Sequence, residues 1–206
     1  MREPAAIDKL AKLFTRFPGI GGRQARRFVY FLLTLNQAER NNLSASIAAL
    51  GAAVRECELC HRFFDSNSDK FTLCDLCRDP ARDGTSLMVV EKDADVAVVE
   101  RSGAYPGRYF ILGGLLPILD KAPASRIRSE ELVTRVTSDK NLNEVIIALA
   151  ASSEGDNTVD YLKPLLLQAL IKTKVKITLL GRGLSTGSEL EYADTDTLKN
   201  AFKNRQ

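Results

Sequence analysis

The spacing of apolar and polar positions predicts helices at the start of this chain. Apolar residues recur three and four positions apart, as in a helix that buries one face, at Ile7, Leu10, Leu13, Phe14 and Phe17. Glycine and proline over 18–22 then predict a turn. A second helix is expected from about Arg23, with an apolar face made by Ala25, Phe28, Val29 and Leu32.

Further along the chain, short apolar runs predict the strands of a parallel sheet. Ser86–Val90 is bounded by glycine and charged residues, and Glu144–Ala150 and Lys174–Gly181 have similar lengths. Between the last two runs, the amphipathic stretch Val159–Lys172 predicts a helix, with Pro164 in its first half. A strand, a helix and a strand of these lengths indicate a right-handed parallel unit.

Composition is that of an ordinary globular protein. The 206 residues are 45% hydrophobic and 27% charged, which excludes disordered and collagen-like chains. We predict a multidomain α+β fold with four regions: a helical head (1–54), a cysteine module (55–80), an α/β domain with a parallel sheet (81–180), and a tail of strand and helix (181–206). Stability at this length does not require disulfides.

Charge is unevenly distributed along the chain. The formal net charge is only +3, but residues 1–62 hold ten basic and five acidic side chains. This asymmetry suggests that the head alone faces a polyanion. No apolar run approaches the roughly 20 residues that span a bilayer, and charged residues interrupt the N-terminus where a signal peptide would be apolar. We therefore expect a cytoplasmic protein with no membrane partner.

The turn and second helix of the head predict a phosphate-binding site. Glycines at 19 and 21 can adopt positive φ and bring backbone amides close to another surface. At 100° per residue, three arginines and Tyr30 project opposite the apolar face. Helix N-terminal amides and guanidinium groups both attract phosphate. The predicted DNA-binding residues are Gly19, Gly21, Arg23, Arg26 and Arg27; a core loop beside a solvated basic face is the structural alternative.

The cysteines carry the most specific chemical signal. They form two Cys-x-x-Cys pairs separated by thirteen residues, namely Cys57, Cys60, Cys74 and Cys77. Two such pairs supply the four thiolates of a closed tetrahedral site, so we predict one structural Zn²⁺ per chain. Two redox-active pairs are the alternative. His61, the only histidine, follows Cys60 directly and is expected near the site but not as a ligand.

Three acids follow predicted strands. Glu91 comes after the first strand, and Glu154 and Asp156 come after the second. The carboxyl ends of parallel strands meet at one edge, where sites form, and carboxylates suit Mg²⁺. Solvated carboxylates that cap a helix and end strands are the alternative.

These motifs resemble known families. Phe17–Arg23 resembles the turn of a helix-hairpin-helix motif, and the three acids resemble those of the Toprim domain of topoisomerases, primases and nucleases. The order of head, cysteines and α/β body resembles the bacterial recombination mediator family RecR along nearly the whole chain. Gly107–Gly114 and Arg182–Asp194 share in the likeness, although Ser185 stands where a proline is usual.

The resemblance implies a non-enzymatic role in DNA repair. Members help to load the RecA recombinase onto single-stranded DNA coated with SSB, together with RecO and RecF, and assemble into ring-like tetramers that can encircle duplex DNA. Arg23 and Arg27 match DNA-contacting positions, the three acids match a surface facing RecO, and the tail matches a segment that interlocks protomers. Asp194 can cap a helix over 195–203. A Toprim metal-dependent nuclease and a zinc-stabilised adaptor that binds only protein are the competing functions.

Overall fold

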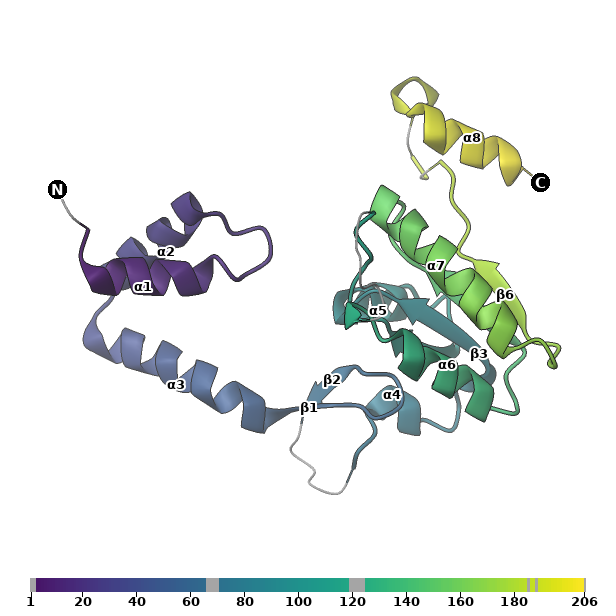
Figure 1. Cartoon of the computed structure of the whole chain (residues 1–206), viewed down its shortest axis with the longest axis horizontal. Coiled ribbons are helices and arrows are strands. Elements are labelled where there is room, and N and C mark those ends of the chain that lie inside the picture. Colours follow the sequence, from purple (N-terminus) through teal and green to yellow (C-terminus); the bar gives the residue numbers. More distant parts are fainter. Residues whose placement is uncertain (1–2, 66–70, 119–124, 185, 188, 206) are drawn as a thin grey trace. The chain divides into compact units, whose positions relative to one another are not determined.

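The computed structural model describes residues 3–65, 71–118, 125–184, 186–187 and 189–205. The chain divides into two compact units, Met1–Val54 and Arg55–Gln206. The first unit is helical, and the second contains a parallel sheet with helices on both faces (Figure 1). The predicted α+β class is confirmed.

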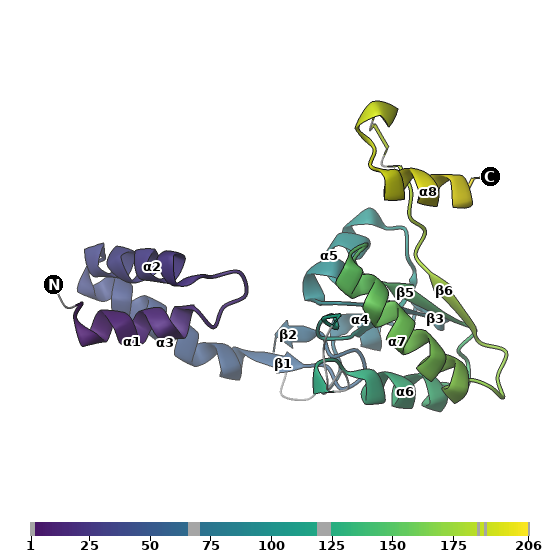
Figure 2. The ribbon, with the colours of Figure 1, turned by 45° about the horizontal axis from the view of Figure 1, so that its top comes forward.

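The described residues of the first unit form three helices: α1 Ala5–Phe14, α2 Gly22–Thr34 and α3 Gln37–Ala53. Helices α1 and α2 lie side by side (Figure 2), because the small residues Ala11 and Ala25 are buried between them with Val29. Phe17 was predicted inside the first helix, but α1 ends at Phe14. The chain turns at this point because the amides of residues 15–17 bond carbonyls of α1's last turn, ahead of Pro18.

Helix α3 begins at a capping box. Asn36 Oδ1 accepts from the Glu39 amide at 2.9 Å, and Glu39 Oε2 accepts from the Asn36 amide at 2.8 Å. These two bonds satisfy donors that a helix N-terminus otherwise leaves unpaired. None of the α3 side chains is buried.

The second unit opens with a small module around the cysteines. Strands β1 Val54–Glu56 and β2 Phe63–Asp65 form a two-stranded sheet, and α4 Asp75–Arg78 follows. The four-stranded sheet contains β3 Asp83–Val90, β4 Gly107–Ile111, β5 Glu144–Ala148 and β6 Lys176–Leu179.

All pairings in the larger sheet are parallel, in the order β4-β3-β5-β6. Alternate residues of β3 pack on opposite faces. Leu87 and Val89 belong to the core with α6 Ser129–Ser138 and α7 Ser153–Ala169, whereas Met88 and Val90 pack with α5 Asp93–Ser102. Burial on both faces explains why β3 reads as a continuous apolar run.

The predicted parallel unit is confirmed, but its helix boundary was wrong. Helix α7 begins at Ser153, six residues before Val159, because Ser152 Oγ accepts from the Gly155 amide at 3.1 Å and caps the helix there. Pro164 consequently lies in the second half of the helix. The acids Glu154 and Asp156 therefore lie in its first turn and not in a preceding loop.

The described residues of the tail contain a 3₁₀ turn, Leu190–Tyr192, and α8 Thr195–Lys203. The strand predicted in the tail is not found among them, because the last strand, β6, already ends at Leu179. The predicted cap is confirmed, since Asp194 Oδ1 accepts from the amides of Asp196 and Thr197, each at 2.9 Å. Ser185 lies outside the described residues. Within the described ranges, every helix is too short or too polar to cross a lipid bilayer.

Candidate metal centre and nucleic-acid interface

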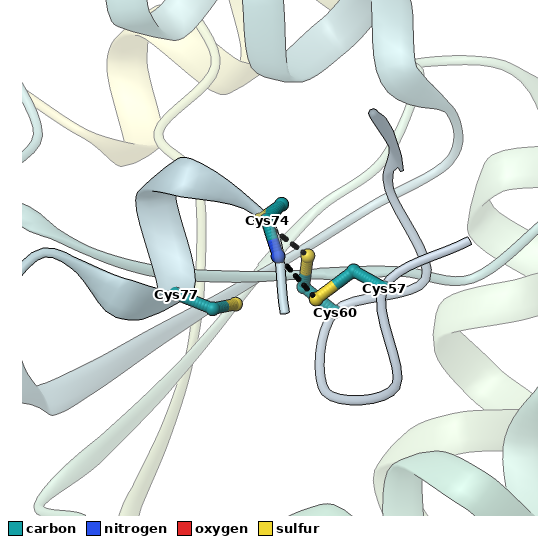
Figure 3. Close-up of side chains that lie close together, drawn as sticks. All are labelled: Cys57, Cys60, Cys74 and Cys77. Carbon is teal, nitrogen blue, oxygen red and sulfur yellow. Dashed lines mark hydrogen bonds between the residues drawn. The ribbon is translucent and has the colours of Figure 1, made fainter. Parts of the chain in front are cut away.

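The four cysteine sulfurs gather at one point (Figure 3), and all lie within 4.8 Å of one another. Cys57 and Cys60 come from the loop after β1, Cys74 is the residue before α4, and Cys77 lies in α4. A tetrahedral zinc with Zn–S bonds of about 2.3 Å separates its sulfurs by about 3.8 Å. Four thiols at this spacing can therefore hold one metal ion.

Backbone hydrogen bonds shape the two pairs. The His61 amide donates to the Cys57 carbonyl at 2.9 Å, and the Cys57 amide donates to the Arg62 carbonyl at 2.8 Å. His61 has a positive φ of 61°, which tightens this turn. The Cys74 amide donates to Cys57 Sγ at 3.3 Å and so links the two halves.

Hydrogen bonds between the thiols shift the pKa values of Cys57 and Cys60 in opposite directions. Hydrogen bonding from Cys60 holds the pKa of the Cys57 thiol well below its usual range, whereas hydrogen bonding to Cys57 raises the pKa of Cys60. Cys57, Cys60 and Cys74 are buried. A bound divalent metal replaces such shared protons, because thiolates are its ligands.

Several contacts attach this cysteine module to the large sheet. The Ile111 amide, at the end of β4, donates to the Cys60 carbonyl at 2.8 Å. The Phe63 amide donates to Asp93 Oδ1 at 2.9 Å, at the start of α5. His61 is outside the sulfur cluster, and its Nδ1 lies 2.7 Å from Glu56 Oε1 while its ring packs against Phe110.

In the head, the two glycines of the turn behave differently. Gly19 has a φ of +75°, in the left-handed region that glycine favours. Gly21 does not use this freedom, since its φ is −80° and it serves as the N-cap of α2. Glycine has no side chain to accept from the first amides of α2, so these donors stay available to a ligand.

The three arginines of α2 are exposed but do not have the same partners. Arg26 Nε lies 3.1 Å from Glu3 Oε2, and the Tyr30 hydroxyl donates to the same carboxylate at 3.5 Å. Arg27 bonds weakly to Gln24, at 3.4 Å. Spacing within α2 could not reveal Glu3, because it lies outside the helix and 23 positions from Arg26.

The three acids do not come together as a metal site. Within the described residues, the four cysteines are the only group of three or more potential ligands placed to hold an ion. Asp156 is paired with Arg182 at 2.7 Å, and Glu91 has Lys92 Nζ at 3.6 Å. A neighbouring cation therefore already offsets the charge of each of these two carboxylates.

Gly155, which lies between Glu154 and Asp156 in α7, occupies a position that is too crowded for a side chain. A Cβ at this position would collide with the backbone carbonyl of Ala150. The close approach brings the first turn of α7 against the end of β5, which positions Glu154 and Asp156 beyond the sheet edge.

The parallel sheet with helices on both faces is the core of a Toprim-domain protein, to which this chain adds a four-cysteine module and a helical head. Residues 85–181 match the family model described as Toprim domain, and residues 183–206 match the one described as RecR, C-terminal.

Full-length relatives identify the family. A protein of Syntrophobacter fumaroxidans named Recombination protein RecR is 36% identical over 203 residues, covering 98% of this chain and 96% of its own. Proteins of the same name from Chloroflexus aggregans and Lactobacillus helveticus are 38% and 32% identical over 202 and 205 residues, covering 98% and 100% of this chain and 94% and 98% of theirs. The chain belongs to the RecR family of recombination proteins.

Proposed function

We propose that this chain is a non-catalytic mediator of DNA recombination and repair in the bacterial cytoplasm, and that it binds single- and double-stranded DNA without reading sequence. Its partners would be RecO and RecF, and its task would be to help load RecA onto SSB-coated single strands. Family membership supports the recombination role. The DNA-binding role rests on the exposed arginine face of α2.

The DNA-binding proposal is supported mainly by two kinds of anion-binding group at the start of α2. Gly21 leaves the N-terminal amides of α2 without a side-chain cap, and Arg23 and Arg27 are exposed in the first two turns of that helix. Both groups favour a phosphate. Phosphate contacts position a protein on DNA but carry no base information directly.

The four cysteines are proposed to hold one structural Zn²⁺. Four sulfur donors leave no open coordination position, so the metal would fold the module and would not activate water. Through the bond from the Ile111 amide to the Cys60 carbonyl, the filled site would also hold β4 in place.

The surface that carries the three predicted acids is proposed to face a protein partner, RecO. Glu91, Glu154 and Asp156 lie beyond strand ends of the sheet, and Arg182 already neutralises Asp156. An Mg²⁺-dependent reaction is not part of this proposal. The tail is proposed to join protomers into a ring-like tetramer.

The test compares full-length Arg23→Ala/Arg27→Ala with wild type by fluorescence anisotropy on labelled DNA. For each phosphate contact that is lost, the slope of log affinity against log salt concentration should become shallower by about one. The affinity near physiological salt should fall about tenfold or more. Lys172→Ala/Lys174→Ala is the matched control, with the same charge change at exposed lysines of the other unit. Equal affinities for wild type and the arginine variant would contradict the proposal that Arg23 and Arg27 contact DNA.

A further inference from the structure

Two large aromatic side chains of α2 lie outside the core of the head. Tyr30 is 50% exposed and Phe31 is 61% exposed. The buried core of this unit is formed by Ala11, Ala25 and Val29, so neither ring is needed to fill it. Adjacent aromatic side chains that are exposed to solvent are suited to bind a ligand with a flat apolar surface.

The two rings continue the arginine face. Tyr30 and Phe31 follow Arg27 by three and four positions, which places them one helical turn beyond it on the same side. Arg23 precedes Arg27 by four positions and extends the row in the other direction. Two guanidinium groups and two aromatic rings therefore succeed one another along one exposed face.

The aromatic pair is separate from the apolar groove of the head. That groove, of about 560 Å³, lies between α1, α2 and α3, and its lining includes Leu32, Leu33 and Ile47 but neither Tyr30 nor Phe31. An apolar protein segment would suit the groove. The aromatic pair instead follows Arg23 and Arg27 along the exposed face of α2, where the Tyr30 hydroxyl bonds the Glu3 carboxylate. Its occupant should therefore combine flat rings with phosphates that those two arginines can hold.

We propose that Tyr30 and Phe31 form a stacking platform for unpaired bases, so that this face prefers single-stranded to duplex DNA. The inference rests on the proposed function, since Arg23 and Arg27 would hold the phosphates of the same strand. Base–aromatic stacking is tolerant of sequence because every base has a π face. In a duplex, neighbouring base pairs cover these faces, and the platform adds nothing.

The experiment uses full-length Phe31→Leu and Phe31→Tyr, with a thymidine oligonucleotide and a duplex of equal length as labelled probes. Leucine keeps an apolar side chain but removes the ring, so affinity for the single strand should fall about tenfold. Tyrosine should retain wild-type affinity. Duplex affinity should stay within about twofold, and the salt dependence should not change, because a neutral ring releases no counterion.

Phe63→Leu, at an exposed phenylalanine of the other unit, is the matched control. Phe31→Leu that binds the single strand like wild type, or weakens both probes equally, overturns the platform. The platform is also overturned if Phe31→Leu changes the molar mass measured by light scattering and leaves the strand preference unchanged, because Phe31 would then contact a second copy of the chain. Arg27→Ala separates the two claims: if it weakens both probes while Phe31→Leu weakens neither, only the platform fails, and if it weakens neither, the proposed function fails.

Discussion

The carboxylate of Glu3 divides the three arginines of the head into two kinds. It pairs with Arg26 at 3.1 Å and accepts from Tyr30, whereas Arg23 and Arg27 have no carboxylate partner among the described ion pairs. An arginine already paired with a carboxylate gains less from a phosphate. Arg26 should therefore contribute less to DNA binding than its spacing suggested.

Replacing Glu3 by Gln should strengthen DNA binding about two- to fivefold. The change releases Arg26 and should steepen the salt dependence by up to about one unit, as expected for one more phosphate contact. Anisotropy across a salt series measures both quantities. Asp8→Asn, which removes the partner of Lys12 on α1, changes the net charge equally. If Asp8→Asn has the same effect, the gain is a matter of overall charge and the role assigned to Glu3 is wrong.

Gly155→Ala should destabilise the second unit. Its new Cβ would collide with the Ala150 carbonyl, and overpacking of this kind costs about 1–3 kcal/mol. Gly181→Ala, in the same unit but with open space around the glycine, should stay within about 0.5 kcal/mol of wild type. Urea unfolding followed by circular dichroism compares them. Equal midpoints for the two variants would show that the approach to Ala150 has no energetic consequence.

At the residue scale, chemistry that is local in sequence could be predicted and chemistry between distant residues could not. The spacing of the cysteines predicted a four-ligand cluster, since each pair lies on one turn and four sulfurs do come together. The pairing of Arg26 with Glu3 and of Asp156 with Arg182 joins residues far apart in the chain. No periodicity encodes such contacts.

At the scale of elements, helix starts depend on single side chains that cap them. The cap of α8 was predicted from Asp194, but the cap of α7 by Ser152 was missed, because the amphipathic pattern becomes clear only from Val159 onward. Strand β4 was also missed as a strand. Its apolar run continues into Gly113, Gly114 and Pro117 without the polar boundary that marks β3.

Asp194→Ala should loosen α8 without affecting the sheet. The side chain accepts from the Thr197 and Asp196 amides, and the Thr197 bond first of all lowers the pKa of Asp194 below its usual 3.8. Its stabilising effect is therefore present at neutral pH and is lost as the pH falls below about 4. Hydrogen exchange of α8 amides should quicken several-fold in the variant. Asp194→Asn should keep the helix protected but abolish the pH dependence, and protection in Asp194→Ala equal to wild type would contradict the cap.

Metal removal should affect only one of the two units. We expect about one zinc per chain by elemental analysis, and chelation should speed hydrogen exchange in β1, β2, α4 and at Ile111, whose amide bonds the Cys60 carbonyl. Helices α1 to α3 belong to the other unit and should exchange as before. Cys57→Ser should reproduce the effect, while His61→Ala should retain the metal. A metal-free preparation with unchanged exchange would contradict a structural role for the site.

At the scale of the whole molecule, the net charge of +3 is small for the DNA-binding role proposed above. The positive charge is concentrated in the head, where a single copy offers only three arginines on the α2 face. Several copies around one DNA molecule would add such faces together. The proposed ring-like assembly would therefore raise the positive charge that the protein presents to one DNA molecule.

The most direct test of this account is the slope of log affinity against log salt concentration for the full-length protein on duplex DNA. Two phosphate contacts from one head, by Arg23 and Arg27, give a slope of about −2, because each contributes about −0.9. Binding by several copies predicts a steeper slope, and Arg23→Ala/Arg27→Ala should then flatten it by more than about 2, which is all that one chain can lose. A shallow slope that the arginine substitutions leave unchanged would contradict the account.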